Sequence, residues 1–304
     1  MPKALIVGGG GFLGTHLTRR LLKDDWQLSH LMFRSRPGRE VPAGVETIYA
    51  DAQPDSIRQS LEKRSFDVVF SLAAAGVEPG QRSASNLFEG NIMLPAALAE
   101  ALSPNPPGRV IHAGSCAEYS PFEGQPFVSE AASCGGADLY GSSKAAGGLW
   151  AAALARAQGF SWVHLRLFHM FGMNEAPHRL VSSLFRQLLS GQPVKLSPGA
   201  QVRDLLYVED VVSALLAAAF MRKEALGDGI FNVCSSVPAT VAEVARTTAR
   251  VVGRDEKLLC FGALDYRPGE LMWLVGDNAK FRAASGWTQV WNLEAGLTTM
   301  KMEP

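Results

Sequence analysis

The sequence ALIVGGGGFLG, residues 4–14, combines a short apolar run, a glycine-rich turn and the start of a helical pattern. Four apolar residues stopped by glycine are typical of a buried parallel strand, and leucines recur at helical spacing through residues 12–23. Gly8, Gly11 and Gly14 therefore have the context of a dinucleotide fingerprint: a tight turn, close approach to a pyrophosphate, and close helix–strand contact. The helix N-terminus would supply free amides to the anion, so we expect a dinucleotide to contact these three glycines, Phe12 and Leu13.

Strand and helix patterns alternate through the first half of the chain. Strands are expected at residues 27–33, 47–50, 67–72, 109–112 and 162–168, and helices at residues 83–102 and 140–157. This alternation predicts an α/β fold with a Rossmann-type, doubly wound parallel sheet. The rhythm changes after Phe168, so we expect a smaller mixed α/β C-terminal lobe for substrate. The dinucleotide-binding domain would comprise residues 1–169 and about 204–236, and the second lobe residues 170–203 and about 237–304.

The composition restricts the class of protein. The chain has 304 residues and a formal net charge of zero, which argues against nucleic acids or acidic membranes as partners. Its longest apolar stretches, such as residues 211–221, are too short to span a bilayer, and the immediate start of a strand argues against a signal peptide. The four cysteines show no close pairing. They are expected to be free thiols in a reducing cytoplasm, without a zinc site or another bound metal.

The residues beyond the second strand bear on which dinucleotide is bound. An acid about twenty positions after the loop would bind the ribose 2′-hydroxyl of NAD, but the sequence there contains Arg34 and Arg36. Guanidinium groups suit a 2′-phosphate, so we expect NADP(H), with NAD(H) as the alternative if both arginines are simply solvated. Asp51 is placed to bind the adenine. The loops after the third and fourth strands would also line the cofactor, through Ala52, Leu72, Ala73 and Ala74.

A candidate catalytic set follows the fifth strand. Tyr140 and Lys144 lie one helical turn apart on the same face, and Ser115 follows a strand whose end should face the ligand crevice. Lys144 would lower the pKa of the Tyr140 phenol and position the cofactor ribose. Tyr140 would then exchange a proton with a carbonyl or alcohol oxygen while hydride is transferred. Ser115 would hold that oxygen.

These motifs, in this order, resemble the extended short-chain dehydrogenases/reductases, the family of nucleotide-sugar epimerases, dehydratases and ketoreductases. The resemblance covers nearly the whole chain and continues through residues 166–172, 203–204, 266–270 and 286–287. It implies a nucleotide-diphosphate sugar as substrate, with Arg203 and Arg267 on the diphosphate and Glu270 near the ribose. A plain surface ion pair between Arg203 and Asp204 is the alternative. The resemblance implies four further cofactor contacts: Asn91, Tyr140, Lys144 and Phe168. It implies four further substrate contacts: Ser115, Cys116, His169 and Arg179.

His169 stands where the family usually has Asn, so a purely structural role for this histidine remains open. Dehydratases of the family resemble one another in placing acids directly after the catalytic Ser or Thr. Cys116 and Ala117 occupy those positions, and Glu118 is expected to point elsewhere. Dehydration is therefore disfavoured.

Two motifs resemble the 4-ketoreductases that act on NDP-4-keto-6-deoxyhexoses in deoxysugar biosynthesis: residues 261–263 before Arg267, and His169 within residues 166–172. CDP-abequose and CDP-paratose synthases belong to this group.

Two other functions remain open. One is an NDP-sugar 4-epimerase with tightly bound NAD, and the other is a non-catalytic, cofactor-sensing protein. Small residues from Ala145 to Ala153 indicate close packing on the Tyr140 helix. Family members often pair two such helices per subunit, so we expect a homodimer through a four-helix bundle formed by residues 83–102 and the Tyr140 helix.

Overall fold

The computed structural model describes residues 1–34, 40–122, 124 and 126–302. Within them, seven parallel strands form one sheet in the order β11-β7-β5-β4-β1-β2-β3. The strands are β1 (Lys3–Val7), β2 (Gln27–Phe33), β3 (Val45–Ala50), β4 (Val68–Ser71), β5 (Arg109–Ala113), β7 (Trp162–Leu167) and β11 (Ile230–Val233). The chain reverses its direction of strand addition between β1 and β4, which is the switch point of a doubly wound sheet. The expected Rossmann-type fold is confirmed.

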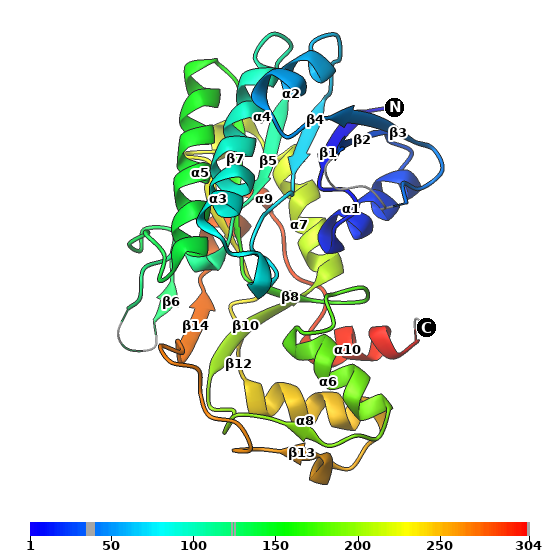
Figure 1. Cartoon of the computed structure of the whole chain (residues 1–304), viewed down its shortest axis with the longest axis vertical. Coiled ribbons are helices and arrows are strands. Elements are labelled where there is room, and N and C mark those ends of the chain that lie inside the picture. The colour runs from blue at the N-terminus through cyan, green and yellow to red at the C-terminus, as the bar shows by residue number, and fades with distance from the viewer. Residues whose placement is uncertain (35–39, 123, 125, 303–304) are drawn as a thin grey trace.

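Helices cover both faces of this sheet (Figure 1). One layer contains α1 (Phe12–Lys23) and α7 (Val208–Phe220), and the other contains α2 (Pro54–Leu61), α4 (Leu94–Leu102) and α5 (Leu139–Ala157). A short α3 (Ala84–Phe88) runs through a π-helical turn, η2 (Glu89–Met93), into α4. Together they form the helix expected over residues 83–102.

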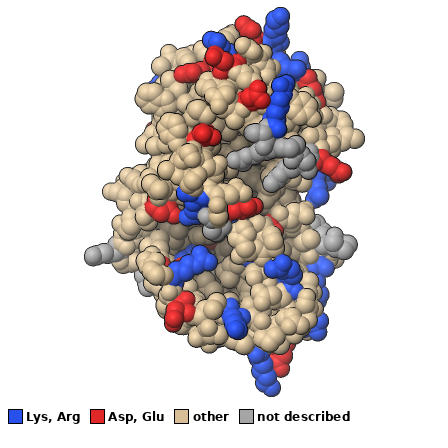
Figure 2. Space-filling view, in the orientation of Figure 1, with Lys and Arg blue, Asp and Glu red and all other residues tan. Residues whose placement is uncertain are grey.

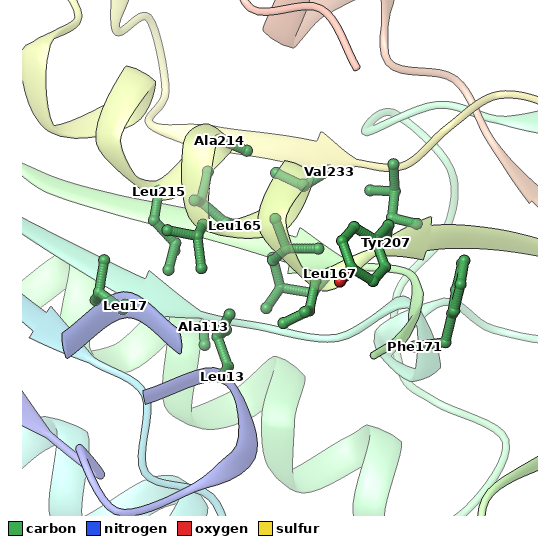
Figure 3. Close-up of a cluster of buried hydrophobic side chains, with 14 of the residues drawn as sticks. Leu13, Leu17, Ala113, Leu165, Leu167, Phe171, Tyr207, Ala214, Leu215 and Val233 are labelled. Atoms are coloured by element: carbon green, nitrogen blue, oxygen red, sulfur yellow. The ribbon is translucent and has the colours of Figure 1, made fainter. Parts of the chain in front are cut away.

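Alternation along the strands divides the core between the two helical layers. Ile6 of β1 belongs to the apolar cluster under α1 and α7, whereas its neighbour Leu5 belongs to the cluster under α2, α4 and α5. Figure 3 shows the first cluster, in which Leu17 of α1 and Leu215 of α7 lie over Leu165 of β7. Both faces of the sheet are thus buried, as parallel strands require.

The lower part of the molecule contains a second, mixed sheet (Figure 1). Its path is β12-β10-β14-β6, and β8 pairs with β10. The elements of this part are β6 (Phe127–Val128), β8 (His169–Phe171), β10 (Val202–Tyr207), β12 (Pro238–Thr240), β14 (Trp273–Gly276), α6 (Leu180–Leu189), α8 (Val241–Val252) and α10 (Leu293–Met302). A two-stranded pair joins β9 (Val194–Lys195) to β13 (Leu259–Cys260).

The remaining short elements are η1 (Pro79–Gln81), η3 (Cys116–Glu118), η4 (Lys223–Ala225), η5 (Glu256–Leu258) and α9 (Ala279–Ser285). None of the helices in the described part of the chain is both long and apolar enough to cross a bilayer.

The strand order refines the expected border between the two parts. β10 pairs with β12 over Val202–Asp204 and with β14 over Val202 and Arg203, so the boundary expected at residue 204 cuts through a strand of the second sheet. In the other direction, α9 packs against β11 of the main sheet, with the rings of Phe281 and Phe231 5.8 Å apart. The division into two domains stays a prediction.

Candidate functional site

The glycine loop joins β1 to α1, where its backbone leaves no room for side chains. Gly8 has a φ of +93°, and a Cβ added to it would lie 2.7 Å from the backbone nitrogen of Ala73. A Cβ on Gly14 would lie 2.3 Å from the carbonyl oxygen of Gly8. The first glycine therefore allows β1 to pass close to the loop after β4, and the third lets α1 pack against the turn.

The start of α1 suits an anion. The N-cap of this helix is Gly11, which has no side chain that could cap it, and its first turn contains no acidic residue. The amides of this turn and the positive end of the helix dipole are therefore free of a competing carboxylate. This cradle fits the pyrophosphate of a dinucleotide, and when bound a reduced nicotinamide would supply the hydride.

The neighbouring strand ends carry the residues predicted for the adenosine half. Arg34 follows β2 directly, its side chain is exposed, and its amide donates to the carbonyl of Ala50 at 3.1 Å. Arg36 lies outside the described residues. Asp51 is exposed beyond β3, and Ala52, Leu72, Ala73 and Ala74 are half-buried. No carboxylate stands at the end of β2 in the described structure, in keeping with the sequence.

Asn91 lies behind the loop that follows β4. Its side-chain oxygen accepts from the amide of Ala75 at 2.8 Å, and its nitrogen donates to the Ala75 carbonyl and to the Ser143 hydroxyl at 3.1 and 3.0 Å. The π-helical turn η2 carries Asn91 into this buried position. The structure thus gives Asn91 a bracing role, whereas its predicted contact with the cofactor stays a prediction.

Ser115, Tyr140 and Lys144 meet at the carboxyl end of β5. Ser115 caps η3, and its hydroxyl accepts from the amide of Ala117 at 3.1 Å. Burial raises the pKa of the Tyr140 phenol, and the influence of the Ser115 side chain opposes that rise without cancelling it. Lys144 is buried and donates from Nζ to the Ala113 carbonyl at 2.7 Å. Burial lowers the pKa of Lys144 to about 8.

Glycines hold α5 close to these elements. A Cβ on Gly141 would lie 2.0 Å from the Ala117 carbonyl oxygen, and one on Gly147 would lie 1.7 Å from the Asn91 carbonyl oxygen. Larger residues at these positions would move Tyr140 and Lys144 away from Ser115. The small residues of this helix therefore serve packing within the chain.

The predicted substrate residues gather beside the triad. Burial and, to a smaller extent, Arg203 and Arg179 lower the pKa of His169 to about 3, so this histidine is neutral. Burial raises the pKa of Cys116 to about 12, while both arginines oppose that rise. The Coulombic influence of Arg179 also reaches Tyr140. The two arginines thus act on the same small region as the catalytic phenol.

Arg203 is not in a surface ion pair with Asp204. It pairs with Glu270 and donates to the Leu271 carbonyl at 2.7 Å. Asp204 is fully buried and accepts from the amides of Ser235, Ser236 and Gly276. These hydrogen bonds connect β10 to the segment after β11 and to β14. The Coulombic influence of the exposed Arg267 reaches Arg203. Arginines therefore gather near the triad. Figure 2 shows that the surface of the molecule is hollowed between its upper and lower parts.

Sequence reasoning missed two residues of this region. The guanidinium of Arg82 lies over the Tyr140 ring, 4.9 Å from its centroid, and pairs with Asp138, the N-cap of α5, at 2.7 Å. The carboxyl of Glu175 accepts from the Ser182 hydroxyl at 2.9 Å and lies 3.6 Å from Arg179, and burial raises its pKa to about 7. Neither residue belongs to a recognisable motif, so only the fold could have revealed them.

Two further observations concern the acid that follows Ser115 and the groups that could hold a metal ion. The Glu118 side chain is 1% exposed and contacts His164 and Arg166 of β7. It is therefore turned away from the predicted substrate contacts, as expected from the sequence. Among the residues that the structure describes, no three His, Cys, Asp or Glu side chains gather in a way that could hold a metal ion.

The glycine cradle is a candidate dinucleotide site, and Ser115, Tyr140 and Lys144 are a candidate catalytic set, on a Rossmann-type fold. The model of the NAD dependent epimerase/dehydratase family matches residues 4–234, and the chain belongs to this family. The resemblance found in the sequence is thereby confirmed.

Individual relatives cover most of the chain. CDP-abequose synthase of Yersinia pseudotuberculosis is 23% identical over 280 residues, which are 89% of this chain and 90% of that protein. UDP-glucuronate 4-epimerase 2 of Arabidopsis thaliana is 26% identical over 276 residues, or 82% of this chain and 63% of that protein. The structure of MoeE5 in complex with UDP-glucuronic acid and NAD is 27% identical, with a TM-score of 0.83 and coverage of 98% and 97%. UDP-glucose 4-epimerase of Thermotoga maritima, 21% identical with a TM-score of 0.87 and the same coverage, shares the fold.

Proposed function

We propose that this chain uses NADPH to reduce the 4-keto group of an NDP-4-keto-6-deoxyhexose in deoxysugar biosynthesis. The observation that carries the proposal is a complete triad with no acidic residue at the two positions that follow Ser115. Ser115, Tyr140 and Lys144 are together, but the positions after Ser115 hold Cys116 and Ala117, and Glu118 faces the opposite way. Elimination of water needs a base and an acid near the sugar, whereas ketone reduction needs only a hydride and one proton.

The chain's own groups account for the proton. Tyr140, whose pKa is raised by burial, keeps its phenolic proton at neutral pH and donates it to the carbonyl oxygen as the carbon receives hydride. Ser115 donates a hydrogen bond to the same oxygen. Lys144 stays largely protonated below its pKa of about 8 and stabilises the phenolate that remains. The proton is then recovered from solvent before the next turnover.

Substrate and cofactor charges are matched locally in a chain without net charge. Arg203, Arg179 and Arg267 supply positive charge for the diphosphate, and MoeE5, as a similar protein, is described with UDP-glucuronic acid and NAD. Arg34 at the end of β2 favours NADPH over NADH, since that strand end offers a guanidinium in place of a carboxylate.

The test offers the purified protein a panel of CDP-, dTDP-, GDP- and UDP-4-keto-6-deoxyhexoses with NADPH or NADH and follows absorbance of the reduced nicotinamide. Consumption of NADPH in step with keto sugar is the expected result. If reduced nicotinamide is not consumed with any of the sugars, the proposal fails.

A 4-epimerase is the second candidate, favoured by relatives such as UDP-glucuronate 4-epimerase 2. An epimerase returns the hydride to the same sugar and should be purified with stoichiometric NAD. A reductase must exchange its cofactor in every cycle. Extraction of the denatured protein and quantification of released NAD and NADP separates the two functions.

The same proposal includes a homodimer through a four-helix bundle. Leu149 and Trp150 of α5 are 53% and 58% exposed, and Phe88 of α3 is 54% exposed. Apolar side chains on these helices would be covered if α4 and α5 packed against a second copy. We expect a solution mass of twice 32.6 kDa and a monomer for Trp150→Glu. A wild-type mass of one chain would contradict the dimer.

A further inference from the structure

A buried polar cluster lies beneath the turn that carries Ser115. Its members come from three elements: His112 of β5, Glu118 of η3, and His164 and Arg166 of β7. All four residues are at most 4% exposed. Charged groups are costly to bury without partners, so a cluster of this kind beside a catalytic turn calls for a physical explanation.

Glu118 is the acid at the centre of this cluster. One carboxylate oxygen accepts the backbone N–H of Ser115 at 2.7 Å. The other accepts from Nε of Arg166 at 3.0 Å and lies 2.9 Å from Nε2 of His164. Burial alone would raise the pKa of Glu118, but His164 and Arg166 outweigh it and bring the pKa to about 2. Glu118 is therefore an anion at neutral pH.

Two glycines make room for these contacts. A Cβ on Gly114 would lie 2.6 Å from the Glu118 carboxylate and 2.5 Å from the His164 ring. A Cβ on Gly148 of α5 would lie 2.2 Å from the same ring. The cluster is therefore built into the packing of β5, β7 and α5, and Glu118 cannot easily adopt another position.

Lys144 holds the same strand end from the other side. Its Nζ donates to the carbonyl of Ala113, while Glu118 holds the amide of Ser115, so the two residues bracket Gly114. Lys144 is 2% exposed. Among the described residues, no carboxylate oxygen lies within 4.0 Å of its Nζ; Glu118 pairs instead with His164 and Arg166. Burial lowers the pKa of Lys144, and the negative charge of Glu118 opposes that decrease.

We propose that Glu118 is a positioning residue that holds the Ser115 turn from beneath and acts as the counter-charge of the buried Lys144. This inference rests on the proposed function for the roles of Ser115 and Lys144. Coulombic attraction between buried groups is stronger than in water, so Glu118 can act on Lys144 without touching it. The titratable and charged groups that face this pair are His112 on β5, Cys116 of η3, Tyr119 after η3, Glu130 and Cys134 in the segment between β6 and α5, and His164 and Arg166 on β7.

The test is Glu118→Gln, which removes the charge and nearly keeps the shape. In the ligand-free protein labelled with ¹³C-lysine, the Lys144 signal, assigned with Lys144→Arg, should titrate near pH 8 in the wild type. In Glu118→Gln its midpoint should fall by roughly one pH unit. The alkaline limb of the pH profile of kcat should move in the same direction.

Tyr119→Phe is the matched control. Its hydroxyl donates to Asn232 at 2.6 Å and accepts from Arg166 at 3.2 Å, so the variant disturbs the same buried region without removing the Glu118 charge. It should lose stability but keep the Lys144 titration. An unchanged midpoint in Glu118→Gln, or an equal decrease in Tyr119→Phe, would overturn the proposal.

If Glu118→Gln does not fold, Glu118→Asp provides the test. The retained charge should keep the Lys144 midpoint, while the shorter side chain should lower the hydrogen-exchange protection of the Ser115 amide. Unchanged protection or a lower midpoint contradicts the proposal. The lysine titration and the hydrogen-exchange measurement need no substrate, so a wild-type protein that reduces no keto sugar would refute the proposed function alone.

Discussion

Burial affects three carboxyl groups near the site in different ways. Glu118 keeps its charge because Arg166 and His164 surround it, and its pKa is about 2. Glu175 has weaker partners, so burial raises its pKa to about 7. Burial also raises the pKa of Asp204, although hydrogen bonds from Ser235, Ser236 and Gly276 oppose the rise. Residue type alone would have assigned the same chemistry to all three.

Replacing Tyr140 tests the proton donor directly. Tyr140→Phe removes the phenolic hydroxyl that is proposed to donate the proton and should lower kcat for ketone reduction by roughly 10²–10⁴-fold. Because the variant keeps the ring, Lys144 and the glycine loop and loses one hydroxyl, NADPH affinity measured by fluorescence titration should change far less than kcat. Retention of wild-type kcat would exclude Tyr140 as the acid, and a cofactor-sensing protein would show no activity to lose.

Arg34 tests the choice of cofactor. Arg34→Ala removes a guanidinium from the end of β2 and should lower kcat/KM for NADPH by about tenfold or more, since a charge-assisted pair to a phosphate is lost. The value for NADH should stay within about twofold, which makes NADH the internal control. Equal losses for both cofactors would mean that Arg34 does not contact the 2′-phosphate.

At the scale of elements, α5 links the catalytic residues to the sheet. Asp138 caps the helix by accepting from the Gly141 amide at 2.8 Å, and Arg82 holds that cap. The sequence indicated close packing from the small residues of this helix. The structure identifies the partners as the Asn91 backbone and the His164 ring.

Gly147→Ala should destabilise the protein although Ala favours helices. The added methyl would lie 1.7 Å from the Asn91 carbonyl oxygen, and overpacking of this kind lowers the free energy of unfolding by about 1–3 kcal/mol. The exposed Ala146→Gly in the same helix is the control, with an expected loss of about 1 kcal/mol from helix propensity alone. Urea unfolding measures both variants. A more stable Gly147→Ala would mean that α5 lies farther from Asn91 than described.

At the scale of the whole molecule, the lower sheet completes a site that begins on the main sheet. β8 follows β7 and pairs with β10. In this pairing His169 lies opposite Leu205, and the charge of Arg203 on β10 acts on it. Asp204 ties β10 to the segments after β11 and within β14. The predicted substrate contacts therefore depend on how the two sheets are connected, whereas the predicted cofactor contacts belong to the main sheet.

The pH dependence of global stability should reveal Glu175. Its pKa of about 7 in the folded state exceeds its ordinary value of 4.5, so the folded protein retains a proton that the unfolded chain loses. The wild type should therefore lose stability relative to Glu175→Gln as pH rises from about 4.5 to 7, by no more than roughly 3 kcal/mol. Denaturant unfolding at several pH values measures this difference. A constant difference would show that Glu175 is ionised throughout the range.

The sequence by itself determined the parallel sheet and the glycine turn, and it indicated Ser115, Tyr140 and Lys144 as a candidate catalytic set. The first two features follow from local patterns, since an apolar run that ends at glycine before a helix indicates the same structure in any α/β chain. The Tyr140 and Lys144 pair is a weak pattern alone and became informative only together with Ser115. The sequence also indicated that Glu118 turns away from the substrate. Alternation along the chain was enough to predict which strands are parallel, because helices separate them.

The tertiary structure alone decided the partners of the buried charges and the boundary of the second sheet. Glu118 meets His164 and Arg166 from 46 and 48 residues away, and Arg203 meets Glu270 from 67 residues away. No local periodicity encodes such pairs, because folding selects them by burial and shape complementarity over long separations. The glycine loop thus specifies the class of ligand in eleven residues, whereas the environment of the catalytic lysine is specified only by the assembled fold.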